Sequence, residues 1–213
     1  MKVKICGLTG KEDAIWAINY GADLLGVNFY KESPRHVSLA SAEKWVSALP
    51  SFASVIGVFV NAEEKEIVKH VSRLKLKGVQ LHGDESPEMV ASLKGALNAA
   101  GLNAYIIKAI RVKDEESLSL LSAYQPSVEY FLLDAFVEGE TGGTGTRFNW
   151  DLALKARESG TPIFLTGGLT PENVKEAVKK VMPFAVDVAS GVEKSPRKKD
   201  QDKIKNFIDH AKK

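Results

Sequence analysis

The sequence alternates short apolar runs with longer segments of helical character, and this alternation is regular along the whole chain. Eight runs have the length of a buried β-strand. They span residues 3–6, 24–29, 55–60, 78–82, 105–110, 130–135, 162–166 and 184–189. Repetition of this kind indicates successive βα units, in which parallel strands are joined by crossover helices.

The segments between the runs carry the periodicity and the start signals of helices. Apolar residues recur at helical spacing in segments 67–74, 174–181 and 204–211. A hydroxyl side chain precedes a proline at Ser86 and at Thr170. Because such a hydroxyl can cap the free N–H groups of a first turn, helices are predicted to start at both places.

Eight βα units predict an α/β fold whose strands close into a (β/α)8 TIM barrel, because eight is the number of parallel strands that closes one. The chain has 213 residues and no linker or break in composition, so residues 1–213 are expected to form a single domain. An open doubly wound sheet is the alternative, but its glycine-rich turn usually follows the first strand. Here the glycines cluster after the last three runs. In a barrel, the active site lies at the carboxyl ends of the strands.

The composition limits the partners that are expected for the chain. One cysteine cannot form an intramolecular disulfide, and no apolar leader follows the amino terminus, so a reducing, cytoplasmic location is expected. No apolar stretch has the length of a membrane span. With 29 basic and 27 acidic residues the net charge is +2, which provides no field to attract nucleic acid. The sequence does not choose between a monomer and a homodimer.

Alternation within the strands predicts which polar side chains face the barrel interior. Apolar residues share one parity, and a set of polar residues shares the other: Lys4, Cys6, Gln80, His82, Lys108, Asp134 and Asp187. Polar groups are costly to bury without partners, and a purely structural barrel would hold Val, Ile and Leu at these positions. We therefore expect a site at one mouth of the barrel, the alternative being a satisfied polar network that only fixes strand register.

Three glycine-rich turns, at 141–146, 166–170 and 189–193, follow the sixth, seventh and eighth runs. Backbone N–H groups without side-chain bulk can point into a shared concavity and hold a phosphate. Barrels commonly bind phosphate after their seventh and eighth strands, which predicts a phosphorylated small-molecule substrate. The residues expected to hold the phosphate are Gly143, Thr144, Gly145, Gly167, Gly168, Ser190 and Gly191.

Cys6 is a candidate base or nucleophile at the end of the first run. A lone cysteine is more often a buried hydrophobe, but this one shares the interior face with Lys4. Lys4 is expected either to favour the thiolate of Cys6 or to neutralise a carboxylate such as Asp187. The sequence leaves both readings open.

Seven segments resemble, in order, those of the phosphoribosylanthranilate isomerase family. They are 4–9, 29–38, 80–83, 132–134, 142–145 with Phe148 and Trp150, 167–174 and 187–193. The resemblance covers nearly the whole chain. Arg197 stands where the family commonly has glycine, a departure that bears only on the conformation of that loop.

The resemblance implies an Amadori rearrangement, with Asp134 as general acid and Cys6 as general base. It also implies that Arg35 binds the anthranilate carboxylate, that His82 and Asp187 line the site, and that no cofactor is needed. The four histidines have no metal-ligand spacing, so no metal is expected. The role of Asn28, which is interior by parity, stays open.

Two other functions remain as alternatives at this point. A barrel of the ribulose-phosphate epimerase type would be expected to use metal-binding histidines and paired aspartates, an arrangement that this sequence lacks. A non-catalytic sugar-phosphate-binding module would have no use for an acid and a base at one mouth. The glycine-rich turns predict one phosphate-binding site. This favours a substrate with one phosphate over the analogous histidine-pathway substrate, which carries two.

Overall fold

The computed structural model describes residues 1–135 and 150–213, and its strands form a closed barrel. Neighbouring strands pair in chain order from β1 to β8, β8 pairs with β1, and every pairing is parallel. This confirms the predicted fold. The strands are β1 (Lys2–Ile5), β2 (Leu24–Asn28), β3 (Val55–Phe59), β4 (Gly78–Leu81), β5 (Tyr105–Val112), β6 (Tyr130–Ala135), β7 (Ile163–Leu165) and β8 (Ala185–Val188).

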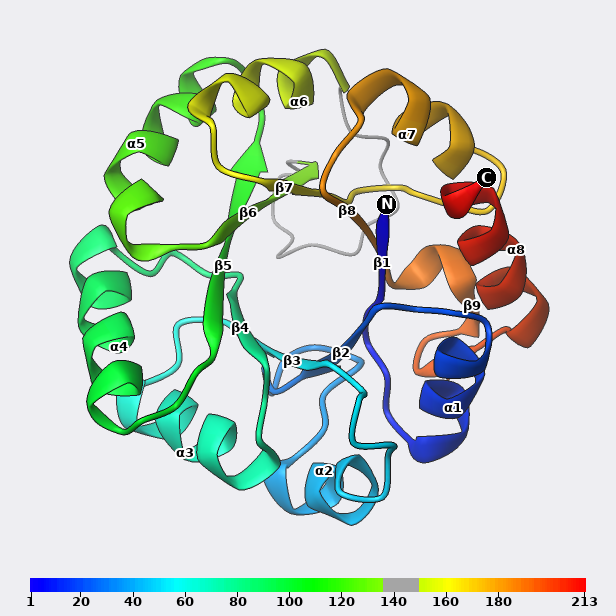
Figure 1. The fold of residues 1–213 in the computed structure, drawn as a ribbon, viewed down its shortest axis with the longest axis horizontal. Helices are drawn as coiled ribbons and strands as arrows, with labels where there is room; N and C mark the ends of the chain where they lie inside the picture. The colour runs from blue at the N-terminus through cyan, green and yellow to red at the C-terminus, as the bar shows by residue number, and fades with distance from the viewer. Residues whose placement is uncertain (136–149) are drawn as a thin grey trace.

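The helices form a ring around the barrel, as Figure 1 shows in a view along its axis. They are α1 (Lys11–Asn19), α2 (Leu39–Val46), α3 (Glu64–Leu74), α4 (Pro87–Ala99), α5 (Leu121–Tyr124), α6 (Trp150–Ala156), α7 (Val174–Val181) and α8 (Gln201–Lys212). Short 3-10 turns span Glu116–Leu120, Gln125–Ser127, Arg157–Ser159 and Ser190–Val192. In the described part of the chain, no helix is long and apolar enough to cross a membrane.

One of the two predicted helix starts is correct and the other is displaced. The Ser86 hydroxyl accepts a hydrogen bond from the Met89 N–H and caps α4, as expected. The Thr170 hydroxyl instead accepts from the Glu172 N–H in a separate turn, and α7 begins only at Val174. The turn precedes the helix because Asn173 bonds back through its amide to the carbonyl of Gly168.

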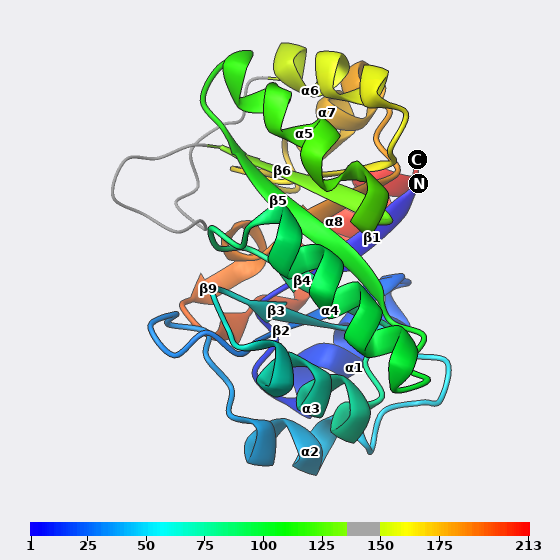
Figure 2. The ribbon, with the colours of Figure 1, turned by 90° about the vertical axis from the view of Figure 1, so that its left-hand side faces the viewer.

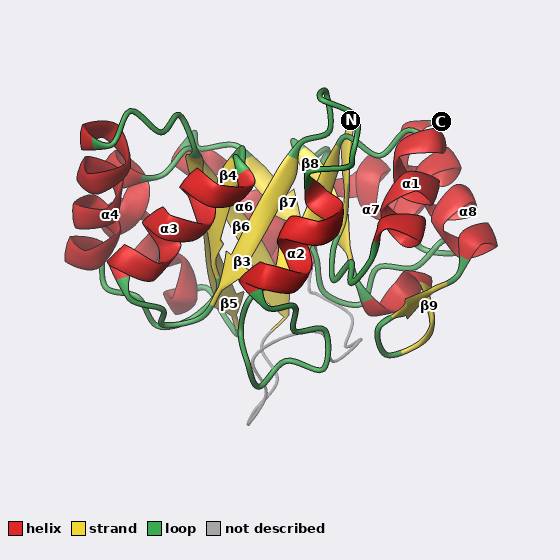
Figure 3. Ribbon diagram, turned by 90° about the horizontal axis from the view of Figure 1, so that it is seen from below, coloured by secondary structure: helices red, strands yellow, loops and turns green. Residues whose placement is uncertain are grey.

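The two ends of the barrel differ in what they carry. Both chain termini lie at one end, and the strand β9 (Glu193–Ser195) lies at the other (Figures 2 and 3). β9 pairs antiparallel with β10 (Lys198–Lys199) in a small hairpin after β8. The sequence did not predict this hairpin, because its strands are short and charged. The hairpin lies at the carboxyl ends of the barrel strands, where the site is expected.

The interior of the barrel holds its own apolar cluster, separate from the main core between the strands and the helices. Its buried members are Ile56, Ile107, Ala109, Leu132, Phe164 and Ala185. The prediction that Lys108 faces this interior was therefore wrong. Ile107 and Ala109 fill the inside, so Lys108 points outward, where its amine meets Glu85 just before α4. Parity was misassigned because an apolar plug occupies the barrel at the level of β5.

Candidate active site

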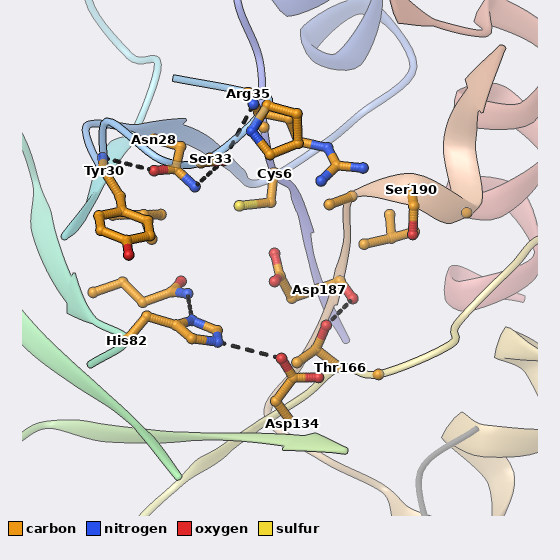
Figure 4. A pocket seen from close by; sticks show the side chains of 18 of the residues that line it. Cys6, Asn28, Tyr30, Ser33, Arg35, His82, Asp134, Thr166, Asp187 and Ser190 are labelled. Carbon is orange, nitrogen blue, oxygen red and sulfur yellow. Dashed lines mark hydrogen bonds and ion pairs between the residues drawn. The ribbon is translucent and has the colours of Figure 1, made fainter. Parts of the chain in front are cut away.

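A cavity of about 500 Å³ opens at the carboxyl ends of the strands, and it gathers most of the residues singled out from the sequence. In Figure 4, Cys6 and Asp134 project into it from different sides. The predicted site residues that line it are Cys6, Arg35, His82, Asp134, Gly167, Gly168, Asp187, Ser190 and Gly191. Gly143, Thr144 and Gly145 lie outside the described residues. A volume of this size suits a small organic substrate.

Lys4 lies under this cavity and is fully buried. Its amine donates hydrogen bonds to Gln80 Oε1 and to Asp187 Oδ1, each at 2.9 Å. Burial by itself lowers the pKa of Lys4, but the charges of Asp187 and Cys6 outweigh burial, so the net pKa is raised. Lys4 therefore stays charged and neutralises Asp187, and the same charge opposes the rise in the pKa of Cys6, so both readings that the sequence left open have support.

The contacts of Lys4 also fix the orientation of the groups between it and Asp134. An ammonium group only donates hydrogen bonds, so the atom of Gln80 facing Lys4 is its oxygen. The Gln80 amide nitrogen then donates to Nδ1 of His82 at 2.8 Å. Neutral His82 consequently carries its proton on Nε2, which donates to Asp134 Oδ2 at 3.2 Å. A continuous chain of bonds thus joins Lys4 to Asp134.

Cys6 follows β1 directly, and its side chain is closely packed against the neighbouring strand. Its N–H donates to the carbonyl of Val188 at 2.8 Å, which ties it to the end of β8. An added Cβ at Gly26 would lie 2.7 Å from the Cys6 sulfur, so the neighbouring strand leaves room only for glycine. Burial raises the pKa of the Cys6 thiol, although the charges of Lys4 and Lys199 oppose this rise.

Arg35 lies in the loop after β2, and its stem lies against the backbone of Gly7, where any added Cβ would collide with it. Its Nε donates to Glu193 Oε1 at 2.8 Å and its Nη2 to Glu193 Oε2 at 2.7 Å. This two-bond pair with β9 raises the pKa of Arg35, chiefly through the hydrogen bonds to Glu193. The guanidinium is therefore a fixed cation at the rim of the cavity.

The described glycine turns meet the requirements of an anion cradle. Gly167 and Gly168 have φ of 87° and 65°, a region that favours glycine. A Cβ at Gly191 would collide with the carbonyl of Leu169, so this backbone approach also requires glycine. Within the described residues, the N–H groups of Gly167, Gly168, Ser190 and Gly191 make no hydrogen bonds. Free N–H groups that line one cavity are suited to phosphate oxygens.

A family model matches nearly the whole chain. The model for N-(5'phosphoribosyl)anthranilate (PRA) isomerase matches residues 3–210. The chain belongs to this family. The PRA isomerase of Trichlorobacter lovleyi is 46% identical to it over 213 residues, which are 100% of this chain and 98% of the relative. The PRA isomerase of Geotalea daltonii is 47% identical over 211 residues, covering 99% and 96%.

Solved PRA isomerases share the architecture. The crystal structure from Thermotoga maritima covers 100% of this chain and 98% of its own, with a TM-score of 0.89 and 40% identity. Another PRA isomerase structure was solved in complex with reduced 1-(o-carboxyphenylamino)-1-deoxyribulose 5-phosphate. It covers 100% and 98% of the two chains, with a TM-score of 0.86 and 39% identity.

Arg197, in the turn between β9 and β10, has a backbone conformation that is unusual for a residue other than glycine. Its φ is 73°, in the left-handed region that glycine adopts freely and other residues adopt at a cost. Its Nη1 donates to the carbonyls of Pro34 and His36, each at 2.9 Å. These two bonds offset the backbone strain and fasten the β9–β10 hairpin to the loop after β2.

Some residues of the PRA isomerase site were not found by sequence reasoning. Glu193 pairs with Arg35 from 158 positions away along the chain, a separation that leaves no signal in the sequence. Thr166 lines the cavity and donates to the carbonyl of Asp187 at 3.0 Å. Asn28, whose role was open, accepts from the Tyr30 N–H and donates to Ser33, so it braces the loop that carries Arg35.

The charged side chains of the PRA isomerase cavity were also compared with the requirements of a metal site. Among residues 1–135 and 150–213, no three His, Cys, Asp or Glu side chains are placed so that they could hold a metal ion. His82 instead bonds to Gln80 and Asp134. The thiol of Cys6 and the carboxyl group of Asp134 are groups that can transfer protons, and the guanidinium of Arg35 is a group that can bind an anion.

Proposed function

We propose that this chain catalyses the Amadori rearrangement of N-(5′-phosphoribosyl)anthranilate to 1-(2-carboxyphenylamino)-1-deoxyribulose 5-phosphate, a step of tryptophan biosynthesis. The observation that carries the proposal is the arrangement of the cavity. A thiol and a carboxyl group face one space from different sides, beside glycine turns with free N–H groups. The family to which the chain belongs supports the same activity.

Asp134 acts in the first step as the general acid. Its proton passes to the furanose ring oxygen, the bond between that oxygen and C1′ breaks, and the nitrogen lone pair forms a Schiff base with C1′. The N–H of His82 holds one carboxyl oxygen of Asp134, so the proton is delivered from a fixed group. A fixed donor lowers the barrier because no ordering is needed at the moment of transfer.

Cys6 acts in the second step as the general base. Its thiolate removes the proton from C2′, and the electron pair of that C–H bond moves toward the Schiff-base nitrogen to give an enolamine. The enolamine then loses its hydroxyl proton and gains one at C1′, which gives the ketone. Lys4 and Lys199 favour the thiolate, because both positive charges oppose the effect of burial on the pKa of Cys6.

Two charged ends of the substrate have matching groups in the cavity. The single phosphate is assigned to the N–H groups of Gly167, Gly168, Ser190 and Gly191. The assignment of Gly143, Thr144 and Gly145 to the same phosphate rests on the sequence alone, since they lie outside the described residues. The anthranilate carboxylate is assigned to Arg35, whose planar fork matches a carboxylate. Binding at both ends leaves C1′ and C2′ between Cys6 and Asp134.

We also infer a homodimer in a reducing compartment, without nucleic-acid partners. The Thermotoga maritima relative is described as dimeric, which supports the first point. The single cysteine is free and sits in the cavity, where oxidation would block it, which supports the second. Light scattering on the purified protein at micromolar concentration is expected to give twice the chain mass, and a monomer mass would contradict the dimer.

Steady-state assay of the wild type, Cys6→Ser and Asp134→Asn with phosphoribosylanthranilate tests the proposed function. The wild type is expected to form the open-chain ketone. Each variant is expected to lose about 10²- to 10⁴-fold in kcat, because each removes one proton-transfer group and leaves binding in place. Full turnover in both variants would overturn the mechanism, and no turnover in the wild type would overturn the function.

A further inference from the structure

Only part of the Arg35 guanidinium is available to a substrate. Glu193 occupies the edge formed by Nε and Nη2, with both of its carboxylate oxygens. Within the described residues, Nη1 has no hydrogen-bond partner. The edge formed by Nη1 and the second Nη2 proton is therefore the one that remains for a second carboxylate.

Glu193 is held in place by a second cation. The amine of Lys199 donates to Glu193 Oε1 at 3.0 Å and to the carbonyl of Ala189 at 2.9 Å. The side chain of Lys199 is fully buried, and that of Glu193 is 5% exposed. Burial lowers the pKa of Lys199, while Glu193 opposes that shift. As long as Lys199 is protonated, the three side chains keep a net positive charge, so pairing with Glu193 does not cancel the attraction of Arg35 for an anion.

The backbone that carries Arg35 is anchored independently of Glu193. The Arg35 N–H donates to the Ser33 hydroxyl at 3.1 Å, and that hydroxyl also accepts from Asn28. On the other side, Arg197 holds the carbonyls of Pro34 and His36. Loss of Glu193 would thus release the arginine fork while the loop stays anchored.

We propose that Glu193 is a positioning residue that sets the selectivity of the site for a substrate carboxylate. It holds the Nε and Nη2 edge of Arg35, directs the Nη1 edge toward the cavity, and relies on Lys199 to preserve the positive charge. A preset fork binds a carboxylate more tightly because the side chain loses no rotamer freedom on binding. The inference rests on the proposed function, since it assigns the carboxylate of that substrate to Arg35.

Kinetics with two substrates tests this role. One substrate is N-(5′-phosphoribosyl)anthranilate, and the other is N-(5′-phosphoribosyl)aniline, which lacks the carboxylate. The wild type is expected to prefer the first in kcat/KM. Glu193→Gln is expected to reduce that preference about tenfold by raising KM for the anthranilate substrate, with kcat changed by less than about twofold. For the aniline substrate, kcat/KM is expected to stay within about twofold of the wild type.

Glu85→Gln is the matched control. Glu85 is also buried and paired with a lysine at the carboxyl end of a strand, but it lies outside the cavity. This variant is expected to lose stability and to keep the wild-type ratio between the two substrates. If Glu193→Gln loses kcat/KM equally on both substrates, or on neither, the proposed role of Glu193 is wrong. The proposed function of the chain is not affected by that result. A wild type that turns over neither substrate overturns the proposed function and this inference with it.

A second variant covers the case in which Glu193→Gln does not fold. Glu193→Asp keeps the charge but shortens the reach to Arg35 and Lys199. Calorimetric titration with reduced 1-(o-carboxyphenylamino)-1-deoxyribulose 5-phosphate, and with its counterpart lacking the carboxylate, needs no turnover. The Kd of the ligand without the carboxylate, divided by the Kd of the ligand with it, measures the selectivity. This ratio is expected to fall about threefold or more in Glu193→Asp relative to the wild type. An unchanged ratio contradicts the proposal.

Discussion

Two buried lysines, Lys4 and Lys108, lie on opposite faces of the same barrel and serve different purposes. Both are essentially inaccessible, with exposures of 0% and 2%. Each pairs with a buried carboxylate, Lys4 with Asp187 at 2.9 Å and Lys108 with Glu85 at 2.8 Å. By burial and pairing alone they are equivalent, so these two properties do not identify a site.

The difference lies in where each set of bonds ends. Lys108 also donates to the carbonyl of Gly83 and lies 5.6 Å from the ring centre of Tyr124, whose hydroxyl donates to the carbonyl of Glu85. That cluster closes on itself between β5 and the helices. The bonds of Lys4 instead continue through Gln80 and His82 to Asp134, in the cavity. A buried network that reaches an open cavity identifies the site.

Replacement of each lysine by methionine is expected to give the largest difference between the two clusters. Lys4→Met and Lys108→Met each leave a buried carboxylate unpaired, so each is expected to lose about 3–5 kcal/mol in free energy of unfolding. Only Lys4→Met is expected to lose turnover, by about 10²-fold or more. Gln80, which orients His82, loses its donor, and Cys6 loses a neighbouring positive charge. Denaturant unfolding and kcat at a temperature where both variants are folded measure the two effects. A comparable loss of kcat in Lys108→Met contradicts the distinction.

Two glycines give a second contrast between the cavity and the outer layer. At Gly26 a Cβ would meet the sulfur and the backbone of Cys6 at 2.7 and 3.0 Å, whereas at Gly95, within α4, it would meet nothing within 4 Å. Gly26→Ala is expected to cost about 1–3 kcal/mol of stability and to lower turnover. Gly95→Ala is expected to add about 0.5–1 kcal/mol through helix propensity. Thermal unfolding of both variants measures this, and effects of the same sign would count against the described packing.

The smallest expected effects come from single hydrogen bonds. His82→Leu removes the donor to Asp134 and is expected to lower kcat about tenfold, because the acid is no longer oriented. Tyr124→Phe removes the donor to the Glu85 carbonyl and is expected to cost about 0.5–1.5 kcal/mol of stability with kcat unchanged. Paired measurements of kcat and of unfolding free energy separate the two, and a His82→Leu variant with wild-type kcat removes His82 from the account.

The fold could be predicted from the sequence because each strand of a parallel barrel is buried on both faces and so appears as an apolar run. A polar residue that interrupts such a run gave a correct interior position at Lys4, Gln80 and Asp187, but the same pattern gave a wrong one at Lys108. Lys108 was misassigned because the apolar plug inside the barrel is as hydrophobic as the outer core. Which side of β5 faces inward depends on the stagger between strands, which a single run does not reveal.

The site was predicted only in part, for reasons of distance along the chain. Arg35 and Glu193 are 158 positions apart, and the hairpin that carries Glu193 has strands too short to predict. The bonds that orient His82 depend on which atom of Gln80 faces Lys4, a matter of geometry. The roles given to Cys6, Asp134 and Arg35 came from the family resemblance. Strand alternation placed Cys6 and Asp134 near one mouth without assigning any step, and it did not place Arg35.

Two pH titrations of the free enzyme show whether the Cys6 thiolate is the base. The rate of Cys6 alkylation by iodoacetamide follows the thiolate fraction, and the rising limb of kcat/KM follows deprotonation of the essential base. Because burial raises the pKa of Cys6, both curves are expected to rise with pH above the usual thiol range, at the same midpoint. In Lys4→Met the alkylation midpoint is expected to move higher still, because the thiolate loses a neighbouring positive charge. Midpoints that differ by more than about one pH unit in the wild type would contradict the assignment of Cys6 as the base.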